Sequence, residues 1–126
     1  MSTVLIVEDS ARNMKLVRDI LQHLGHTTLE ATTGADAVRL ALQQPPDLIL
    51  MDVQLPDLDG TEALRRLRAH RALDATPVVA VSASVMPEQH RAIVQSGFDA
   101  FISKPIELKQ FRETVRHFLA HGRTTS

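Results

Sequence analysis

The fold is indicated most clearly by residues 46–60, which read PDLILMDVQLPDLDG. Segment 47–51 contains a continuous apolar run and predicts a strand buried on both faces, with Asp52 directly after it. The following segment, 55–60, is rich in the Pro, Asp and Gly residues of turns. Asp59 is suited to cap the amino end of a helix. The stretch therefore predicts a strand, a loop and a helix in succession.

The same alternation of short apolar runs and helical periodicity extends over the whole chain, and it is the pattern of βα units around a parallel sheet. The predicted strands cover residues 3–8, 27–31, 47–51, 78–81 and about 99–102. The predicted helices cover residues 11–24, 35–42, the segment after Asp59, about 87–97 and about 107–120. The buried stripe of the last helix is predicted to contain Leu108, Phe111, Val115 and Phe118.

The composition of the strands also predicts their order in the sheet. The runs at 3–8, 47–51 and 78–81 are apolar and belong in the centre, whereas 27–31 contains polar residues and suits an edge. These positions fit a doubly wound α/β fold of the flavodoxin-like class, a five-stranded parallel sheet of order 2-1-3-4-5 with helices on both faces. Residues 1–126 then form a single domain, with a core at about 3–119 and a disordered polar tail at 121–126.

Composition excludes several classes of function. The 126 residues are 44% hydrophobic and 23% charged, as in ordinary globular proteins, and the formal net charge is -1. This charge predicts no direct binding to nucleic acid or to an anionic membrane. The absence of cysteine excludes disulfides, thiolate metal sites and cysteine nucleophiles. No leader and no apolar run of membrane-spanning length is found, so a cytoplasmic location is expected.

Residues of distinctive chemistry follow four of the predicted strands. They are Glu8 and Asp9, then Asp52, then Ser82, and finally Lys104 before Pro105. The carboxyl ends of parallel strands share one edge of the sheet, so these side chains should meet there. Mg²⁺ prefers a few carboxylate oxygens together with a substrate phosphate, and a carboxylate can act as a nucleophile toward phosphorus. A hydroxyl and an ammonium group would stabilise the transferred phosphoryl group.

Each of these residues also has a simpler interpretation on its own. Glu8 and Asp9 are suited to cap the first helix, and Asp52 to stabilise a turn. Ser82 is suited to hydrogen bonding within a loop, and Lys104 to a solvated position. Only the joint arrangement at one sheet edge favours a phosphoryl site over these separate roles.

Four motifs give the chain a resemblance to the receiver domain of two-component response regulators, from about residue 3 to residue 119. They are VLIVEDS, PDLILMDVQLPDLDG, TPVVAVSA and GFDAFISKP. The resemblance implies that Asp52 accepts a phosphoryl group from a phosphohistidine. The donor would be a sensor histidine kinase or a histidine phosphotransfer protein, and a downstream protein target would recognise the product. On this interpretation the chain is a signalling phosphoacceptor that assists its own phosphorylation and dephosphorylation, and not an enzyme.

The resemblance also implies a role for each site residue. Asp9 and Asp52 match the direct Mg²⁺ ligands, with Mn²⁺ as a substitute, and Glu8 would act through water. Gln54 would supply its backbone carbonyl to the metal, and Lys104 would bind the phosphate. Ser82 occupies the position of the switch hydroxyl.

Two further positions follow from the resemblance. Phe101 would be either a rotameric switch or an ordinary core residue, and the Lys104–Pro105 bond would be cis. The surface that responds to phosphorylation would comprise the fourth helix, the fifth strand and the fifth helix. The protein would be a monomer or a phosphorylation-dependent dimer.

Several alternatives stay open. The chain resembles stand-alone, DivK-like receivers, but a receiver excised from a hybrid histidine kinase or a multidomain regulator would carry the same motifs. An aspartyl-phosphate hydrolase requires a second Asp at the position of Gln54, and flavodoxin-like cofactor binding requires aromatic residues that are scarce here. A basic cluster at Arg65, Arg66, Arg68 and Arg71 is interpreted as a solvated face. The histidines at positions 23, 90, 117 and 121 are placed on helix surfaces, without a metal-binding role.

Overall fold

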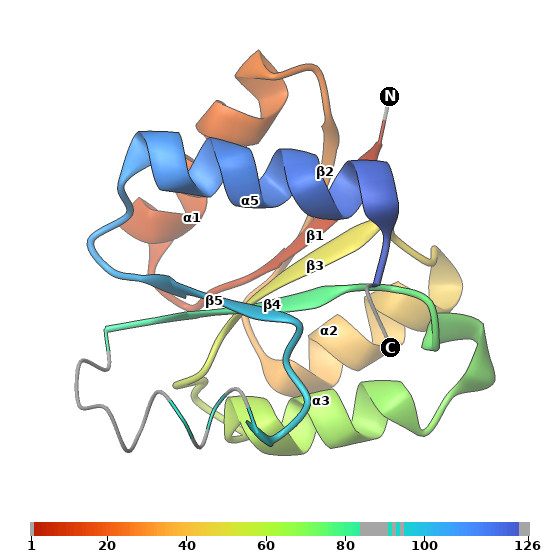
Figure 1. Ribbon diagram of the computed structural model, residues 1–126. Helices are drawn as coiled ribbons and strands as arrows, with labels where there is room; N and C mark the ends of the chain where they lie inside the picture. Colours follow the sequence, from red (N-terminus) through yellow and green to blue (C-terminus); the bar gives the residue numbers. More distant parts are fainter. Residues whose placement is uncertain (1, 84–90, 92, 94, 124–126) are drawn as a thin grey trace.

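A parallel sheet of five strands forms the centre of the computed structural model, which describes residues 2–83, 91, 93 and 95–123 (Figure 1). The strands are β1 (Thr3–Val7), β2 (Thr27–Ala31), β3 (Leu48–Asp52), β4 (Val78–Ser82) and β5 (Ala100–Ser103). Their order is β2-β1-β3-β4-β5, and every neighbouring pair is parallel. The predicted order is confirmed, with the polar β2 at an edge and the apolar β1, β3 and β4 inside.

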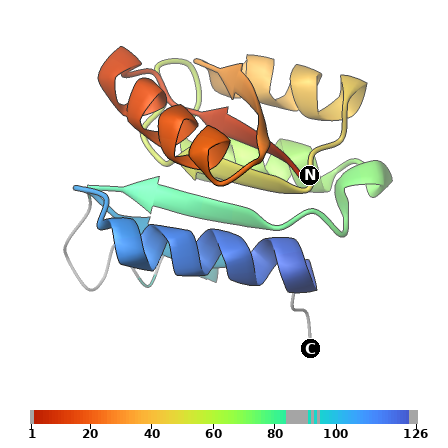
Figure 2. The same ribbon diagram turned by 90° about the horizontal axis from the view of Figure 1, so that it is seen from above.

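Helices cover both faces of this sheet. They are α1 (Ala11–His23), α2 (Gly34–Gln43), α3 (Gly60–Arg68) and α5 (Leu108–His121), with a short 3₁₀ helix at Arg71–Leu73. Helices α1 and α5 lie on one face, and α2 and α3 lie on the other (Figures 1 and 2). The helix predicted at about 87–97 lies largely outside the described residues.

Alternation along the strands divides the core into two layers. Residues such as Ile6 and Leu50 point toward α1 and α5, where Phe111 is fully buried. Their neighbours Val7 and Met51 point toward α2 and α3. Because both faces of the central strands are covered, these strands are apolar along their whole length. The polar side chains of these central strands therefore lie at the strand ends.

Two details differ from the sequence prediction, and a third decides between its alternatives. Helix α1 is capped by Ser10, whose Oγ accepts from the Asn13 N–H, so the simpler interpretation of Glu8 and Asp9 as its caps is wrong. Leu108 is 51% exposed because it begins α5 at the rim of the sheet, outside the buried stripe. In the segment predicted as a disordered tail, His121 belongs to α5 and Arg123 is paired with Asp99.

The loop between β3 and α3 is anchored at several points. The Asp57 carboxylate accepts hydrogen bonds from the N–H groups of Gly34 and Ala35, at 2.8 and 3.0 Å, and so caps the start of α2. These bonds lower the pKa of the Asp57 carboxyl group. At the far end of the loop, a Cβ on Gly60 would lie 2.7 Å from the Cα atom of Val53, so only glycine fits there without displacing the backbone. The backbone that follows Asp52 is therefore fixed at both ends.

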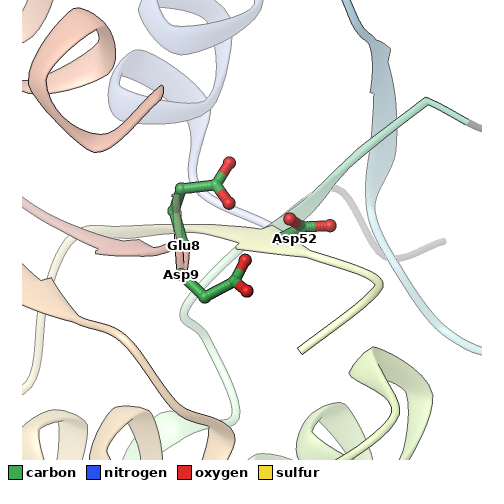
Figure 3. A group of neighbouring side chains, drawn as sticks. All are labelled: Glu8, Asp9 and Asp52. Atoms are coloured by element: carbon green, nitrogen blue, oxygen red, sulfur yellow. The ribbon is translucent and has the colours of Figure 1, made fainter. Parts of the chain in front are cut away.

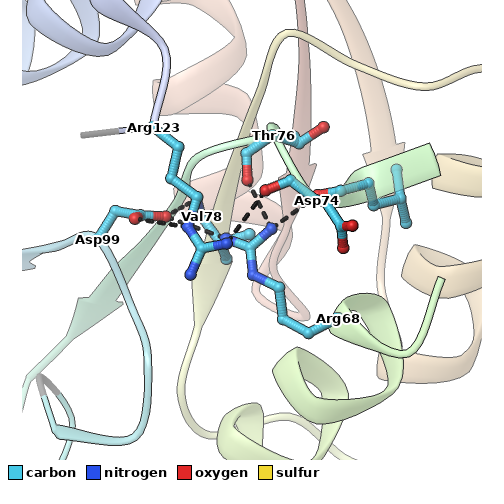
Figure 4. Close-up of polar contacts among 7 residues, drawn as sticks. Arg68, Asp74, Thr76, Val78, Asp99 and Arg123 are labelled. Carbon is cyan, nitrogen blue, oxygen red and sulfur yellow. Dashed lines mark hydrogen bonds and ion pairs between the residues drawn. The ribbon is translucent and has the colours of Figure 1, made fainter. Parts of the chain in front are cut away.

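A second polar cluster lies at the amino ends of the strands, where β4 and β5 begin (Figure 4). The Asp99 carboxylate accepts from Arg68 and from Arg123, at 3.1 Å in each case. Arg68 also donates to the carbonyl oxygens of Leu73 and Thr76. The interpretation of the four arginines as a solvated face is therefore wrong for Arg68, whose burial lowers the pKa of its guanidinium group.

Candidate functional site

The acidic residues are brought together by the register of β1 and β3. Val7 is paired with Met51, so the next residues, Glu8 and Asp52, lie side by side where the two strands end. Strand alternation places both on the sheet face that carries Ile6 and Leu50, the face covered by α1 and α5. Asp9 follows Glu8 in the turn that leads into α1. Local strand geometry is thus sufficient to assemble the three carboxylates.

Glu8, Asp9 and Asp52 each offer one carboxylate oxygen, and these three oxygens lie within 4.8 Å of one another. Figure 3 shows the three side chains grouped together. Glu8 and Asp52 are buried, whereas Asp9 is exposed. Among the described residues, no hydrogen-bond donor reaches the Asp9 carboxylate. The cluster therefore combines two enclosed carboxylates with a third that is open to solvent.

Lys104 supplies the positive charge of the site. Its Nζ donates to Oε1 of Glu8 at 2.8 Å and to Oδ2 of Asp52 at 3.0 Å. Burial alone would lower the pKa of the lysine, but the hydrogen bonds and charges of the two carboxylates together raise it. The Lys104 backbone N–H donates to the Ser82 carbonyl oxygen, and the Lys104–Pro105 bond is cis, as the resemblance implied. One ammonium group is thus shared by two acids from different strands.

The remaining predicted residues surround this centre. The Gln54 backbone N–H donates to Oδ1 of Asp52 at 3.0 Å, which fixes the first turn of the loop. Ser82 is buried at the end of β4, one residue beyond the register partner of Asp52. Phe101 is partly buried on β5 and packs against the core on the α2–α3 face. The functional roles implied for these three residues remain predictions.

Electrostatic repulsion and burial distinguish Glu8 from an ordinary surface acid. Burial, and to a smaller extent the hydrogen bond and charge of Asp52, raise the pKa of Glu8 above 4.5, while Lys104 partly opposes the shift. The proton that Glu8 binds more tightly in the folded state stabilises the fold below pH 4.5, and this contribution is lost as the pH rises through the raised pKa. An ionised Glu8 is therefore unfavourable for folding at neutral pH.

Glu8→Gln is accordingly expected to be more stable than the parent at neutral pH in EDTA, because glutamine resembles the protonated acid. The gain in the free energy of unfolding should be largest at neutral pH and should shrink as the pH falls through the raised pKa, because Glu8 of the parent then takes up a proton itself. Urea denaturation across this range measures it. Glu113→Gln, at a position on α5 away from the cluster, is the matched control and should show no such trend. A parent that is more stable than Glu8→Gln at neutral pH would contradict the assignment.

The donor set meets the requirements of a magnesium ion. Mg²⁺ selects hard oxygen ligands, uses only a few carboxylates and retains several waters. The cluster offers two buried carboxylates and the solvent-accessible Asp9, and a cation there would offset the repulsion between these acids. The residues therefore fit a divalent, oxygen-preferring cation.

Comparison with known proteins assigns the family. The model of the response regulator receiver domain matches residues 4–116. The chain belongs to this family. The receiver domain is 43% identical over 117 residues to the "Polar-differentiation response regulator DivK" of Brucella ovis, covering 93% of this chain and 95% of that protein. The DivK protein of Brucella anthropi has the same identity over the same length. The resemblance inferred from the motifs is confirmed, and it identifies a signalling module of two-component systems.

Solved structures give the same result for the fold. The receiver domain of a sensor histidine kinase from Pseudomonas aeruginosa, described with a magnesium ion coordinated in its active site cleft, superposes with a TM-score of 0.88. It is 29% identical and covers 94% of this chain and 98% of its own. The chemotaxis response regulator CheY4 of Vibrio cholerae superposes with a TM-score of 0.87 at 26% identity, covering 93% and 98%. Among the helices described here, none has both the length and the hydropathy needed to cross a bilayer.

Proposed function

We propose that this receiver domain is the phosphoacceptor of a phosphorelay and that Asp52 receives the phosphoryl group. The observation that carries the proposal is the position of Lys104, whose ammonium group is within hydrogen-bonding distance of both Glu8 and Asp52. A cation beside an acceptor carboxylate is suited to hold the oxygens of a phosphoryl group attached there. The donor protein would be a sensor histidine kinase or a histidine phosphotransfer protein.

A divalent ion would be held by the acidic cluster. Asp9 and Asp52 would bind Mg²⁺ directly, Glu8 would act through water, and the Gln54 carbonyl would complete the protein ligands. Bound there, the ion would neutralise the negative charge of the phosphoryl oxygens. Mn²⁺, which also prefers oxygen ligands, would substitute for it. Support comes from the proximity of the three carboxylates and from the magnesium ion described for the Pseudomonas receiver.

In the proposed reaction, a carboxylate oxygen of Asp52 attacks the phosphorus of a phosphohistidine. An O–P bond forms and the N–P bond breaks, and the imidazole leaves with the bonding electrons and takes up a proton from solvent. Before the reaction, Lys104 limits the repulsion between Glu8 and the acceptor. After it, Lys104 and the Ser82 hydroxyl would hydrogen-bond the phosphoryl oxygens.

The new negative charge would then alter the surface of the domain. Movement of Ser82 toward the phosphoryl group would be followed by an inward rotation of Phe101, whose strand β5 is paired with β4. The affected surface would include the fourth helix, β5 and α5, and would bind a downstream protein or a second copy of the domain. Sedimentation with and without the phosphate mimic beryllofluoride distinguishes these two partners.

Acetyl phosphate provides the direct test of the proposal. Incubation with this donor and Mg²⁺ should add roughly 80 Da to the intact mass, as one phosphoryl group. The modification should be removed by hydroxylamine, which attacks acyl phosphates, and should not form in EDTA. A protein that stays unmodified with Mg²⁺, or a phosphate that resists hydroxylamine, would overturn the proposal.

A further inference from the structure

Helix α5 carries a histidine pair that lies outside the acidic site. His117 and His121 are four residues apart, which places them on the same side of the helix one turn from each other. Both side chains are exposed, and their ring centroids are 4.9 Å apart with the planes inclined at 45°. The sequence interpretation gave these histidines no metal-binding role. The structure brings the two rings together, and no ion pair is recorded for either histidine among the described residues.

The separation of the rings matches that of two imidazoles on one metal ion. Zn²⁺ binds imidazole nitrogen at about 2.0–2.1 Å in tetrahedral geometry. Since a ring nitrogen lies about 1.1–1.2 Å from the ring centre, two ligating rings would have centroids roughly 5 Å apart. The observed 4.9 Å agrees with this value. The two rings are therefore close enough for one nitrogen of each to reach a shared ion.

The neighbouring side chains favour such an arrangement. The His117 and Phe118 rings form a T-shaped contact, with centroids 5.0 Å apart and planes at 87°. Glu113 lies one turn before His117 on the same side of α5 and adds negative charge there. Two imidazoles at this spacing on a helix are also a recurrent zinc-binding arrangement.

We propose that His117 and His121 chelate one late first-row divalent ion, of which Zn²⁺ is the representative. Water would fill the remaining coordination positions, because in the described part of the chain the only group of three or more candidate ligands is that of Glu8, Asp9 and Asp52. The two sites differ in chemistry, since imidazole nitrogen favours zinc, nickel and copper whereas the carboxylate cluster favours magnesium. The histidine site does not depend on phosphorylation of Asp52.

Isothermal titration with Zn²⁺, in the presence of excess Mg²⁺ to occupy the carboxylate cluster, tests the site. The parent is expected to bind Zn²⁺ with micromolar affinity. His117→Gln and His121→Gln should each bind about tenfold more weakly or worse, because the second imidazole otherwise binds at a high effective concentration. His70→Gln is the matched control, since His70 is exposed and its side chain makes no capping hydrogen bond.

Two further measurements make the outcome decisive. Asp52→Asn should retain the Zn²⁺ site, which separates it from the acidic cluster and from the proposed phosphorylation. In the parent, Zn²⁺ should shift the ring-proton resonances that disappear in His117→Gln and His121→Gln. Equal Zn²⁺ affinity in the parent and both variants, or loss of binding in Asp52→Asn alone, would overturn the proposal.

Discussion

Asp52→Asn is expected to reduce phosphorylation by acetyl phosphate to the level of unreacted protein. The substitution replaces the carboxylate nucleophile by an amide while retaining an oxygen that can accept the Gln54 N–H. It also removes one negative charge from the cluster, and with it the repulsion that Asp52 exerts on the remaining acids. The intact mass after incubation with Mg²⁺ and the donor measures the effect, and circular dichroism verifies that the variant is folded.

Asp57→Asn is the matched control for this experiment. Asp57 lies in the same loop as Gln54, but its carboxylate is directed at the start of α2 and not at the acidic cluster. The control should therefore be phosphorylated as the parent is, with at most a small loss of stability from the weakened cap. Labelling of Asp52→Asn to the same extent as Asp57→Asn would place the acceptor elsewhere.

The proximity of the acidic residues was predictable because the position of each one is encoded locally. The apolar run that precedes Asp52 predicts where β3 ends and which side chain lies at that end. The run that precedes Glu8 does the same for β1. Parallel pairing then determines that both ends meet, since all strands of such a sheet run in one direction. Neither inference needs knowledge of side-chain conformation.

Contacts that depend on the packing of distant segments were not predictable in the same way. Asp57 caps a helix that begins 23 residues earlier, and nothing in its local sequence separates it from an ordinary turn residue. Leu108 has helical spacing appropriate to the core, yet the rim position of the first turn of α5 leaves it exposed. Whether such a residue is covered by another element depends on how far that element extends in the folded structure.

Arg68 gave a partial signal that the sequence interpretation missed. It lies four residues after Leu64 and so falls toward the buried side of α3, unlike Arg65 and Arg66, which pair with Glu62 in solvent. An arginine on the inner side of a helix requires an acidic or carbonyl partner. That partner, Asp99, is 31 residues away in the sequence, and only the fold brings it next to Arg68.

Asp99→Ala is expected to lower the free energy of unfolding by about 3–5 kcal/mol, the range for removing one partner of a buried ion pair. The Asp99 side chain is only 7% exposed, and the side chains of Arg68 and Arg123 are 17% and 26% exposed. The substitution would leave both guanidinium groups without their carboxylate and the Val78 N–H without its 2.8 Å acceptor. Since a domain of this size is stable by only about 5–15 kcal/mol, the loss is a large fraction of the total.

Urea denaturation of Asp99→Ala, with Asp19→Ala as the control, measures this loss. Asp19 is 57% exposed and its pairing with Lys15 spans 4.0 Å, so its removal should change the free energy of unfolding by less than about 1 kcal/mol. Arg123→Ala should have an intermediate effect, because Arg68 and the Val78 N–H would still satisfy Asp99. This variant keeps the test decisive if Asp99→Ala does not fold.

The position of Asp99 allows the same variants to test whether the amino ends and the carboxyl ends of the strands act independently. Asp99 joins the amino ends of β4 and β5, whereas the acidic cluster lies at the carboxyl ends of β1 and β3. Folded Arg123→Ala should therefore be phosphorylated by acetyl phosphate to the same extent as the parent, since Glu8, Asp52 and Lys104 are untouched. If Asp99→Ala is no less stable than Asp19→Ala, the ion pairs of Asp99 with the two arginines are screened by solvent and do not stabilise this end of the sheet.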